Sequence, residues 1–195
     1  EMQRSLVGSE MCIRDRFMVI ATQNPFGSVG TQKLPESQMD RFMIRVTMGY
    51  PSVEDEVSIM KSKTGGLSNR VLSKNVINAQ DFMAMRDIVD EVYVDDSIYE
   101  YVAKIVAKTR DSDDILQGIS PRGSISIINM AKAEAFLRGH DYVLPSDIQF
   151  VLNDTMAHRI ILNRSLKRGH ITEESVIDSI CRSVDVPKIG TRGIL

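Results

Sequence analysis

The sequence contains no tryptophan, and aromatic residues make up only 6% of its 195 residues. Neither charge is in excess, because 24 Lys and Arg face 26 Asp and Glu, for a formal net charge of −2. Nucleic-acid-binding proteins usually carry a basic patch and aromatic side chains for base stacking, so no nucleic-acid partner is predicted. Hydrophobic residues still reach 43%, which is enough for a chain of this length to bury a core.

Cysteines and long apolar runs are scarce too. The two cysteines, Cys12 and Cys181, cannot build a disulfide framework, and neither has a histidine at metal-ligand spacing. No apolar run approaches the ~20 residues of a transmembrane helix. Residues 1–16 lack the apolar stretch of a signal peptide. We therefore predict a cytoplasmic protein without a membrane span.

The usual catalytic motifs are also missing. The sequence has neither the G-x-S-x-G nucleophile motif nor the G-x-x-x-x-G-K-[ST] phosphate loop. Its histidines, His140, His158 and His170, are scattered and match no triad or metal-ligand spacing, so no metal site is predicted. The residues Ile88-Val89-Asp90-Glu91 imitate an Asp-Glu magnesium motif. They fall within an amphipathic helical pattern rather than at a strand end, so we assign them no metal.

The patterns that are present divide the chain into two parts. In the first part, residues 17–21 form the continuous apolar run of a buried parallel strand. Residues 43–48 have the β-branched alternation of a second strand. A short helix is predicted over residues 34–42, and a capping box of Ser52 and Asp55 opens another. Two parallel strands cannot stand alone as a sheet, so we expect the end of a larger α/β domain.

All later periodic signals are helical and predict a bundle of about five amphipathic helices. Helices are expected to begin at Ser120-Pro121, at Pro145 and at Thr172, the first of them ending at Gly139. The expected buried positions recur at helical spacing: Phe82, Met85, Ile88 and Val89; Ile98, Tyr101, Val102, Ile105 and Val106; Ile148, Val151, Leu152 and Met156; Val176, Ile177, Ile180 and Val184.

Three polar residues are difficult to explain by packing. Asn24 follows the first predicted strand, where an amide can orient a water or contact a phosphate; alternatively, Asn24-Pro25 is only a turn. Arg41 near the end of a short helix either stabilises the helix dipole or reaches a neighbouring subunit's γ-phosphate. Arg122 lies in a first helical turn, where the dipole disfavours a cation by up to ~1 kcal/mol. It is either a solvated surface residue or holds an anion together with the helix start.

The segments ATQNP, GTQKLPESQMDRFMIRVTMGYPS and SPRGSISIINMAKAEAFLRGHDYVLPSDI occur in this order. Together they resemble the C-terminal part of a MoxR-type AAA+ ATPase, over residues 17–187. By this resemblance Asn24 is the sensor 1 residue that positions the attacking water. Arg41 is the arginine finger that acts in trans, and Arg122 is the sensor 2 arginine that contacts the ATP phosphates. His158-Arg159-Ile160 also resembles the family pattern, but we expect it only to pack.

The resemblance implies a fold class of α/β plus all-α. Residues 17–66 would be the end of a P-loop AAA+ core, residues 67–187 a helical lid domain and residues 188–195 a loose tail. It implies ATP and Mg²⁺ as cofactors, and a homo-oligomeric ring, expected to be a hexamer. The ring would hydrolyse ATP to remodel or assemble client proteins, with von Willebrand factor A-type proteins as candidate partners.

The family's phosphate loop and its Asp-Glu magnesium motif are expected upstream of residue 17, where only sixteen residues stand. Those residues, which include SLVGSEMCIRDR, resemble an adapter-derived peptide, so residues 1–16 are predicted to be a non-native leader. The chain as written is therefore expected neither to bind ATP tightly nor to hydrolyse it alone. The alternative hypothesis is a non-enzymatic helical interaction module. A DNA-dependent motor is disfavoured by the charge balance.

Overall fold

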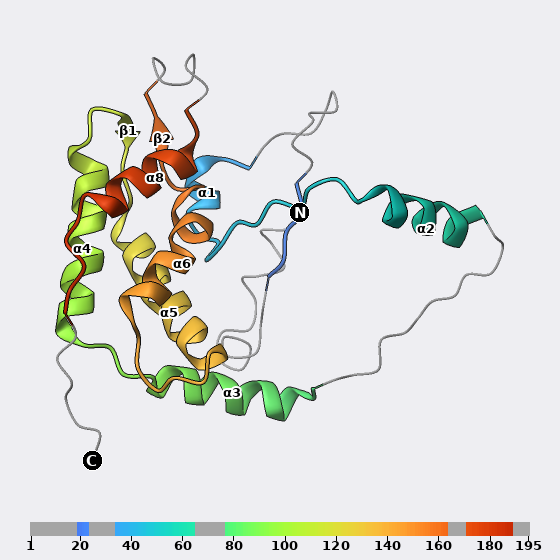
Figure 1. The fold of residues 1–195 in the computed structure, drawn as a ribbon, viewed down its shortest axis with the longest axis horizontal. Helices are drawn as coiled ribbons and strands as arrows, with labels where there is room; N and C mark the ends of the chain where they lie inside the picture. Colours follow the sequence, from blue (N-terminus) through green and yellow to red (C-terminus); the bar gives the residue numbers. More distant parts are fainter. Residues whose placement is uncertain (1–18, 24–33, 65–76, 164–170, 189–195) are drawn as a thin grey trace, which may run out of the picture. The chain divides into compact units, whose positions relative to one another are not determined.

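The computed structural model of the protein describes residues 19–23, 34–64, 77–163 and 171–188. The chain divides into two compact units, Glu1–Pro35 and Glu36–Leu195. The second unit contains α1 (Glu36–Met39), α2 (Val53–Thr64), α3 (Ala79–Glu91), α4 (Asp96–Asp111), β1 (Ile115–Gln117), α5 (Pro121–Leu137), α6 (Pro145–Met156), β2 (Ile161–Leu162) and α8 (Glu173–Arg182) (Figure 1). Its described part is therefore mostly helical, as predicted.

The predicted helix starts are confirmed by their capping bonds. Ser52 Oγ accepts a hydrogen bond from the Asp55 amide at 3.1 Å and opens α2. Thr172 Oγ1 accepts one from the Ser175 amide at 3.2 Å and opens α8. These bonds satisfy amides that have no partner within the first helical turn.

Proline and glycine mark the ends of α5 as predicted. Pro121 and Pro145 occupy the first turns of α5 and α6, where the missing N–H costs nothing. Gly139, two residues beyond α5, has φ of 79°, a left-handed conformation that favours glycine.

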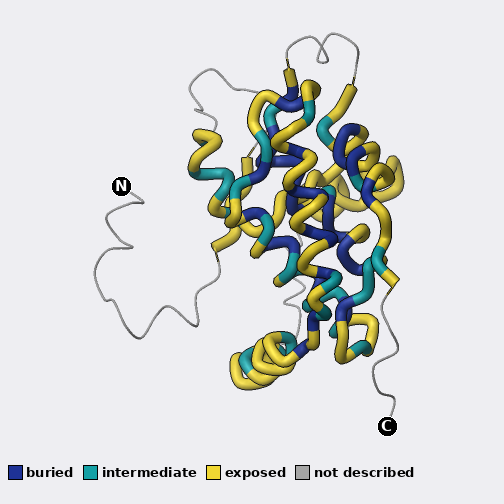
Figure 2. The backbone as a smooth tube through the Cα atoms, turned by 90° about the vertical axis from the view of Figure 1, so that its left-hand side faces the viewer, coloured by how far each residue is buried: buried dark blue, intermediate teal, exposed yellow. Residues whose placement is uncertain are grey.

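The core lies where α4, α5, α6 and α8 meet. α5 packs against α4 and α6, and α8 packs against the same two helices, with the buried segments between them (Figures 1 and 2). The predicted apolar faces of α4, α6 and α8 are confirmed as buried: Ile98, Tyr101, Val102, Ile105, Val106, Ile148, Val151, Leu152, Met156, Val176, Ile177, Ile180 and Val184. These helices therefore form one shared hydrophobic core.

The prediction of a buried face on α3 is wrong for the described residues. Phe82 and Ile88 are exposed, and Met85 and Val89 are only partly buried. α3 contacts α5, but the described elements leave Phe82 and Ile88 about half exposed. Periodicity reports that a face is apolar, and it does not say whether a neighbour is present to cover it.

The strands also differ from the prediction. The described residues of the two expected strands, 19–21 and 43–48, form no strand, because a β-ladder needs a neighbouring strand and none pairs with them in the described part of the chain. A short antiparallel pair of β1 and β2 was not predicted; it aligns Ile115 with Leu162 and has an irregularity before Gln117. Strands of two or three residues are too short to display a period.

Replacement of a core isoleucine tests this packing. Ile105→Ala in α4 removes a side chain that is 0% exposed, so we expect it to lower the unfolding free energy by about 2–4 kcal/mol. The matched control Ile125→Ala alters an isoleucine of α5 that is 61% exposed and should cost less than about 0.5 kcal/mol. Urea unfolding followed by circular dichroism measures both. Equal shifts of the midpoint would contradict the assignment of the core.

Candidate functional site

The candidate site is built around a buried arginine. Arg159 follows α6 directly and lies in the turn after its last residue, with a side chain that is 1% exposed. Its position continues the buried face of α6, because it is four residues after Thr155 and seven after Leu152. A cation at a position suited to an apolar side chain needs polar partners, because an unpaired buried charge costs several kcal/mol.

Those partners come from α6 and from two other segments of the chain. Arg159 Nε donates to Asp40 Oδ1 at 3.1 Å, which makes an ion pair with the residue that follows α1. The other guanidinium nitrogens donate to the Ser126 hydroxyl of α5 at 3.0 Å and to the carbonyls of Phe42 at 2.7 Å, Met43 at 3.1 Å, Asp40 at 3.3 Å and Thr155. Every nitrogen of the guanidinium is therefore bonded, and the turn after α1 is attached to the helical bundle.

A glycine in α5 leaves room for this arginine. A Cβ atom on Gly123 would lie 3.1 Å from Cδ of Arg159 and would overlap the side chain of Ile119. The small residue at this position lets the Arg159 stem pass along α5. The glycine that follows Arg122 in the sequence is therefore explained by close packing against Ile119 and, less tightly, against Arg159.

The Asp40 carboxylate joins Arg159 to the start of α5. The Ser120 hydroxyl donates to both of its oxygens at 3.2 Å, and Arg122 Nη1 approaches Oδ2 at 3.3 Å. The side chain of Arg122 is 56% exposed and that of Asp40 is 25% exposed. One carboxylate therefore lies between a buried and a solvent-exposed guanidinium, so this cluster carries one positive charge in excess.

Burial and charge act in opposite directions on Arg159. Burial lowers the pKa of the guanidinium, while the Asp40 carboxylate raises it. Arginine remains charged at neutral pH, because its ordinary pKa is far above 7. The excess positive charge at the exposed side of the cluster makes this an environment that attracts an anion.

His158 is the neutral neighbour of this cluster. Its Nε2 lies 3.1 Å from the Phe42 carbonyl, and the N–H of the neutral ring donates there. Burial and, to a smaller extent, the positive charge of Arg159 lower the pKa of His158 to about 4. Its Nδ1 is buried and has no hydrogen-bond partner in the part of the chain that is described. The structure thus disfavours a second cation beside Arg159.

The structure brings two of the three predicted site residues near one another. Arg41 lies in the turn between Asp40 and Phe42 and is exposed, and its side chain forms no hydrogen bond or ion pair with the described residues. Arg122 contacts Asp40, the residue next to Arg41. Asn24 lies outside the described residues.

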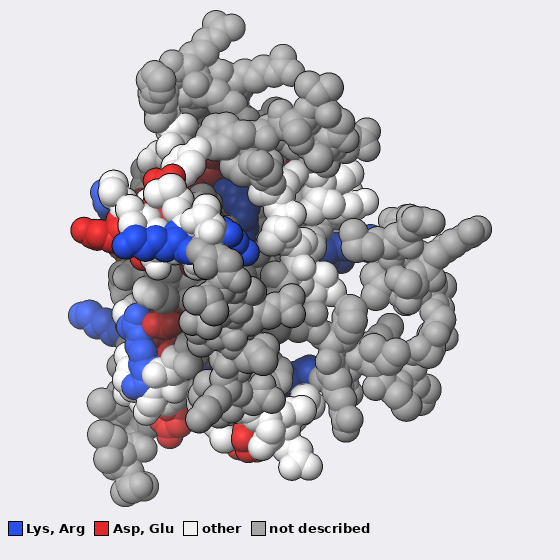
Figure 3. Space-filling view, turned by 90° about the vertical axis from the view of Figure 1, so that its right-hand side faces the viewer, with Lys and Arg blue, Asp and Glu red and all other residues white. Residues whose placement is uncertain are grey.

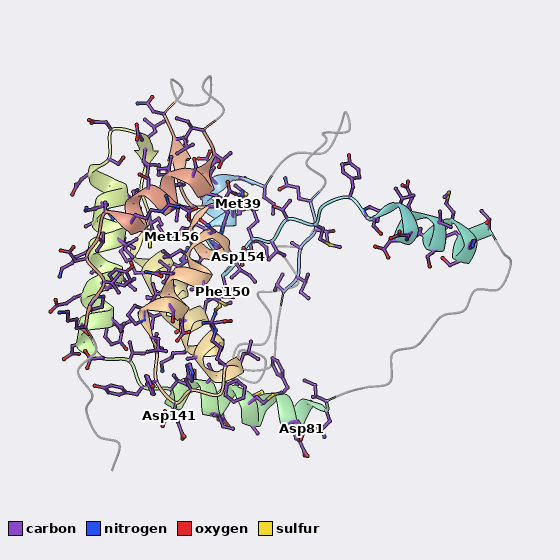
Figure 4. All side chains as sticks on the ribbon, in the orientation of Figure 1. Met39, Asp81, Asp141, Phe150, Asp154 and Met156 are labelled. Atoms are coloured by element: carbon purple, nitrogen blue, oxygen red, sulfur yellow. The ribbon has the colours of Figure 1, made fainter. Side chains whose placement is uncertain are left out.

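Sequence reasoning missed Asp40 and Arg159. The expectation that Arg159 only packs is incomplete, because its guanidinium holds Asp40 and three carbonyls of residues 40–43. One available signal was the position of a cation on the buried face of α6. Asp40 gave no signal of its own. A second contact joins the same segments, since the Arg45 amide donates to the Asp154 carbonyl at 2.9 Å. Asp154 lies on α6, close to Met156 at the end of that helix (Figure 4).

The described surface supports neither a metal site nor a nucleic-acid stripe. No group of three His, Cys, Asp or Glu side chains could hold a metal among the described residues. On the left of the face in Figure 3, Lys and Arg side chains lie beside Asp and Glu side chains. In the same part of the chain, no helix has the length and apolarity that crossing a bilayer requires.

Comparisons with known proteins identify the family. Two family models match: the AAA lid domain over residues 107–180, and the ATPase family associated with various cellular activities (AAA) over residues 1–44. Chaperone MoxR1 of Mycobacterium tuberculosis is 31% identical over 194 residues, which cover 95% of this chain and 51% of the relative. The chain belongs to the MoxR-type AAA+ ATPases. The matched lid model and the AAA+ structural neighbour described below confirm the predicted fold class, a C-terminal AAA+ fold with a helical lid.

Two further relatives agree with this MoxR-type assignment. The uncharacterized protein YeaC of Bacillus subtilis is 40% identical over 180 residues, which cover 92% of this chain and 56% of the relative. The crystal structure of a candidate ATPase from Cytophaga hutchinsonii matches with a TM-score of 0.74 and 32% identity, over 85% of this chain and 53% of that chain. The MoxR-type chain therefore spans about half the length of the curated relatives it matches.

The unequal burial of the two arginines at Asp40 predicts unequal effects of mutation. Asp40→Asn removes the carboxylate charge from the buried Arg159, so we expect a loss of about 2–3 kcal/mol in unfolding free energy. Arg122→Gln removes only the exposed partner and should cost less than about 1 kcal/mol. Urea midpoints at constant m-value measure both, and a larger loss for Arg122→Gln would contradict this order.

His158 predicts a stability loss in mild acid. Its folded pKa of about 4 lies below the ordinary 6.5, so the unfolded chain binds a proton first as the pH falls. The unfolding free energy should therefore decrease between pH 6.5 and 4, by about 1–3 kcal/mol from this group. In His158→Gln, whose amide can still donate to the Phe42 carbonyl, that part of the decrease should disappear. Parallel pH curves for the two proteins would contradict the prediction.

Proposed function

We propose that this chain forms the lid and the finger-bearing segment of an ATPase that binds and hydrolyses ATP in an oligomeric ring. The observation that carries the proposal is the cluster at Asp40. It joins the segment of Arg41 to the lid, while the guanidinium of Arg41 stays exposed and makes no bond with the described residues. The backbone around Arg41 is held in place, while its guanidinium makes no bond with the described residues. Such an arginine is suited to contact a nucleotide bound by another subunit.

The proposed roles of the site residues follow from charge and exposure. Arg122, with its guanidinium 56% exposed beside a net positive cluster, would bind a phosphate oxygen of the nucleotide as sensor 2. Arg41 would stabilise the charge on the γ-phosphate bound by the next subunit. Asn24, as sensor 1, would position the attacking water.

Magnesium is proposed to be held outside the described residues. When bound, Mg²⁺ would supply positive charge that neutralises the phosphate groups of the nucleotide. The described residues provide no group of carboxylates, histidines or cysteines that fits such an ion. The ligands are therefore proposed to come from the family's Asp-Glu motif, and the chain alone is proposed not to hydrolyse ATP.

The biological role is proposed from the family. A homo-hexameric ring in the cytoplasm would use hydrolysis to remodel or assemble client proteins, and von Willebrand factor A-type proteins are candidate partners. The similarity to a protein named as a chaperone, MoxR1 of Mycobacterium tuberculosis, supports a role on client proteins. The balanced charge of the sequence, with a formal net charge of −2, favours protein clients over nucleic acid.

Removal of the Arg41 side chain tests the proposal. In the full-length protein that joins this segment to the family's phosphate loop, Arg41→Ala should lower ATP turnover by about 10³-fold, because the charge on the transferring phosphoryl group loses its cation. ATP affinity should remain unchanged, since this arginine acts on the nucleotide of the next subunit. Steady-state turnover and nucleotide titration measure the two effects.

The matched control is Arg182→Ala, which removes an exposed arginine from the last turn of α8 and should leave turnover unchanged. Unchanged turnover in Arg41→Ala would overturn the assignment of the finger. An absence of both ATP binding and ATP turnover in the unmutated full-length protein would favour the non-enzymatic interaction module instead.

A further inference from the structure

We propose that Arg159 is a positioning residue, which fixes the backbone on both sides of Arg41 and so presents this finger to the neighbouring subunit. This inference rests on the function proposed above. Its basis is that one buried side chain of the lid bonds the residue before Arg41 and the two residues after it, while Arg41 itself remains exposed.

The residues that Arg159 bonds lie on both sides of Arg41 in the sequence. On the N-terminal side, the guanidinium binds the carboxylate of Asp40 at 3.1 Å and its carbonyl at 3.3 Å. On the C-terminal side, it binds the carbonyl of Phe42 at 2.7 Å and that of Met43 at 3.1 Å. With these points held, the backbone at residue 41 has little freedom, and the direction in which its Cα–Cβ bond leaves the backbone is set.

The short helix α1 cannot supply this order by itself. It has only four residues, Glu36–Met39, and none of them is buried. A single isolated turn of helix is unstable in water, because nucleation fixes several dihedral angles for one hydrogen bond. The two backbone bonds that close the turn, from Arg41 N to Gln38 O at 3.1 Å and from Phe42 N to Met39 O at 3.0 Å, therefore depend on an external anchor.

The anchor is rigid because the lid holds Arg159 from two helices. Its guanidinium also donates to the Ser126 hydroxyl of α5 at 3.0 Å and to the Thr155 carbonyl of α6. Both acceptors are buried residues, and α5 and α6 pack against each other in the core. Movement of the lid would consequently carry the finger with it, which links the lid of one subunit to the nucleotide site of the next.

Stability alone does not explain an arginine here. A buried ion pair is often no more stabilising than apolar side chains of similar size, because both charges must leave water. A planar group that bonds several carbonyls at once does, however, specify one geometry. The positioning role therefore predicts that a variant can keep the fold of the bundle and still misplace the finger.

The first test reads the local order of this chain. In Arg159→Lys, which keeps the charge but loses the planar fork, amide hydrogen exchange at Arg41 and Phe42 should become at least ~10-fold faster. Exchange at Ile105 in the core of α4 should not change. Ser126→Ala, which removes one acceptor and leaves the other bonds of Arg159, should produce a smaller change in the same direction. Unchanged exchange at residues 41 and 42 in Arg159→Lys would overturn the proposal.

The second test uses mixed rings of the full-length protein. Arg159→Lys should lower kcat by about 100-fold without a change in the KM for ATP, as expected when a catalytic group is displaced by about 1 Å. The nucleotide site of the Arg159→Lys subunit itself stays intact. Mixing with subunits whose phosphate-loop lysine is replaced, but which carry normal Arg41 and Arg159, should therefore restore turnover.

Arg41→Ala and Arg138→Met serve as references in the mixing test. Arg41→Ala should behave as Arg159→Lys does, whereas Arg138→Met should retain full turnover, although Arg138 also pairs with a buried carboxylate, Asp147. Rescue of Arg41→Ala without rescue of Arg159→Lys would overturn the positioning role and leave the finger assignment intact. Full activity of Arg41→Ala would instead overturn the proposed function, and the exchange data would still decide whether Arg159 orders this segment.

Discussion

The arrangement of this MoxR-type lid depends on one buried positive charge. The Arg159 guanidinium is removed from water, so each of its nitrogens needs an acceptor and its charge needs a carboxylate. Asp40 supplies the carboxylate, and backbone carbonyls supply most of the other acceptors. These requirements determine how the turn after α1 lies against α5 and α6, and they explain why Gly123 faces the arginine stem.

The same carboxylate connects two arginines of different character. Arg159 is enclosed by protein and has a fixed set of partners, whereas Arg122 is largely exposed and holds Asp40 through a single contact of 3.3 Å. An exposed ion pair contributes little free energy and is easily exchanged for another anion. In the proposed role of Arg122, a phosphate group would replace Asp40 at this arginine while the pair with Arg159 persists. The cluster combines a permanent attachment with a replaceable one.

The sequence predicted those parts of the fold that depend on residues close to one another along the chain. The caps at Ser52 and Thr172 and the apolar faces of α4, α6 and α8 are local patterns, and the structure has them where expected. The ion pair of Asp40 and Arg159 joins residues 119 positions apart, a contact that no periodicity reveals. The prediction of a buried face on α3 was wrong for the same reason, since an apolar face does not identify its neighbour. Of the site, the resemblance supplied Arg41 and Arg122 but not the residue that holds them together.

One further consequence concerns the segment after this cluster. Residues 43–48 have a strand-forming sequence and form no ladder, and their apolar side chains are exposed, with Met48 at 92%. Met43 and Arg45 use their backbone groups in bonds to Arg159 and Asp154, but residues 46–48 make no backbone hydrogen bond with the described residues. A short run of β-branched and apolar residues with such unpaired backbone groups is a template for pairing between chains. At high protein concentration, copies of this chain would therefore associate through residues 43–48 into intermolecular β-structure. Aggregation would then compete with any assembly that is built through Arg41.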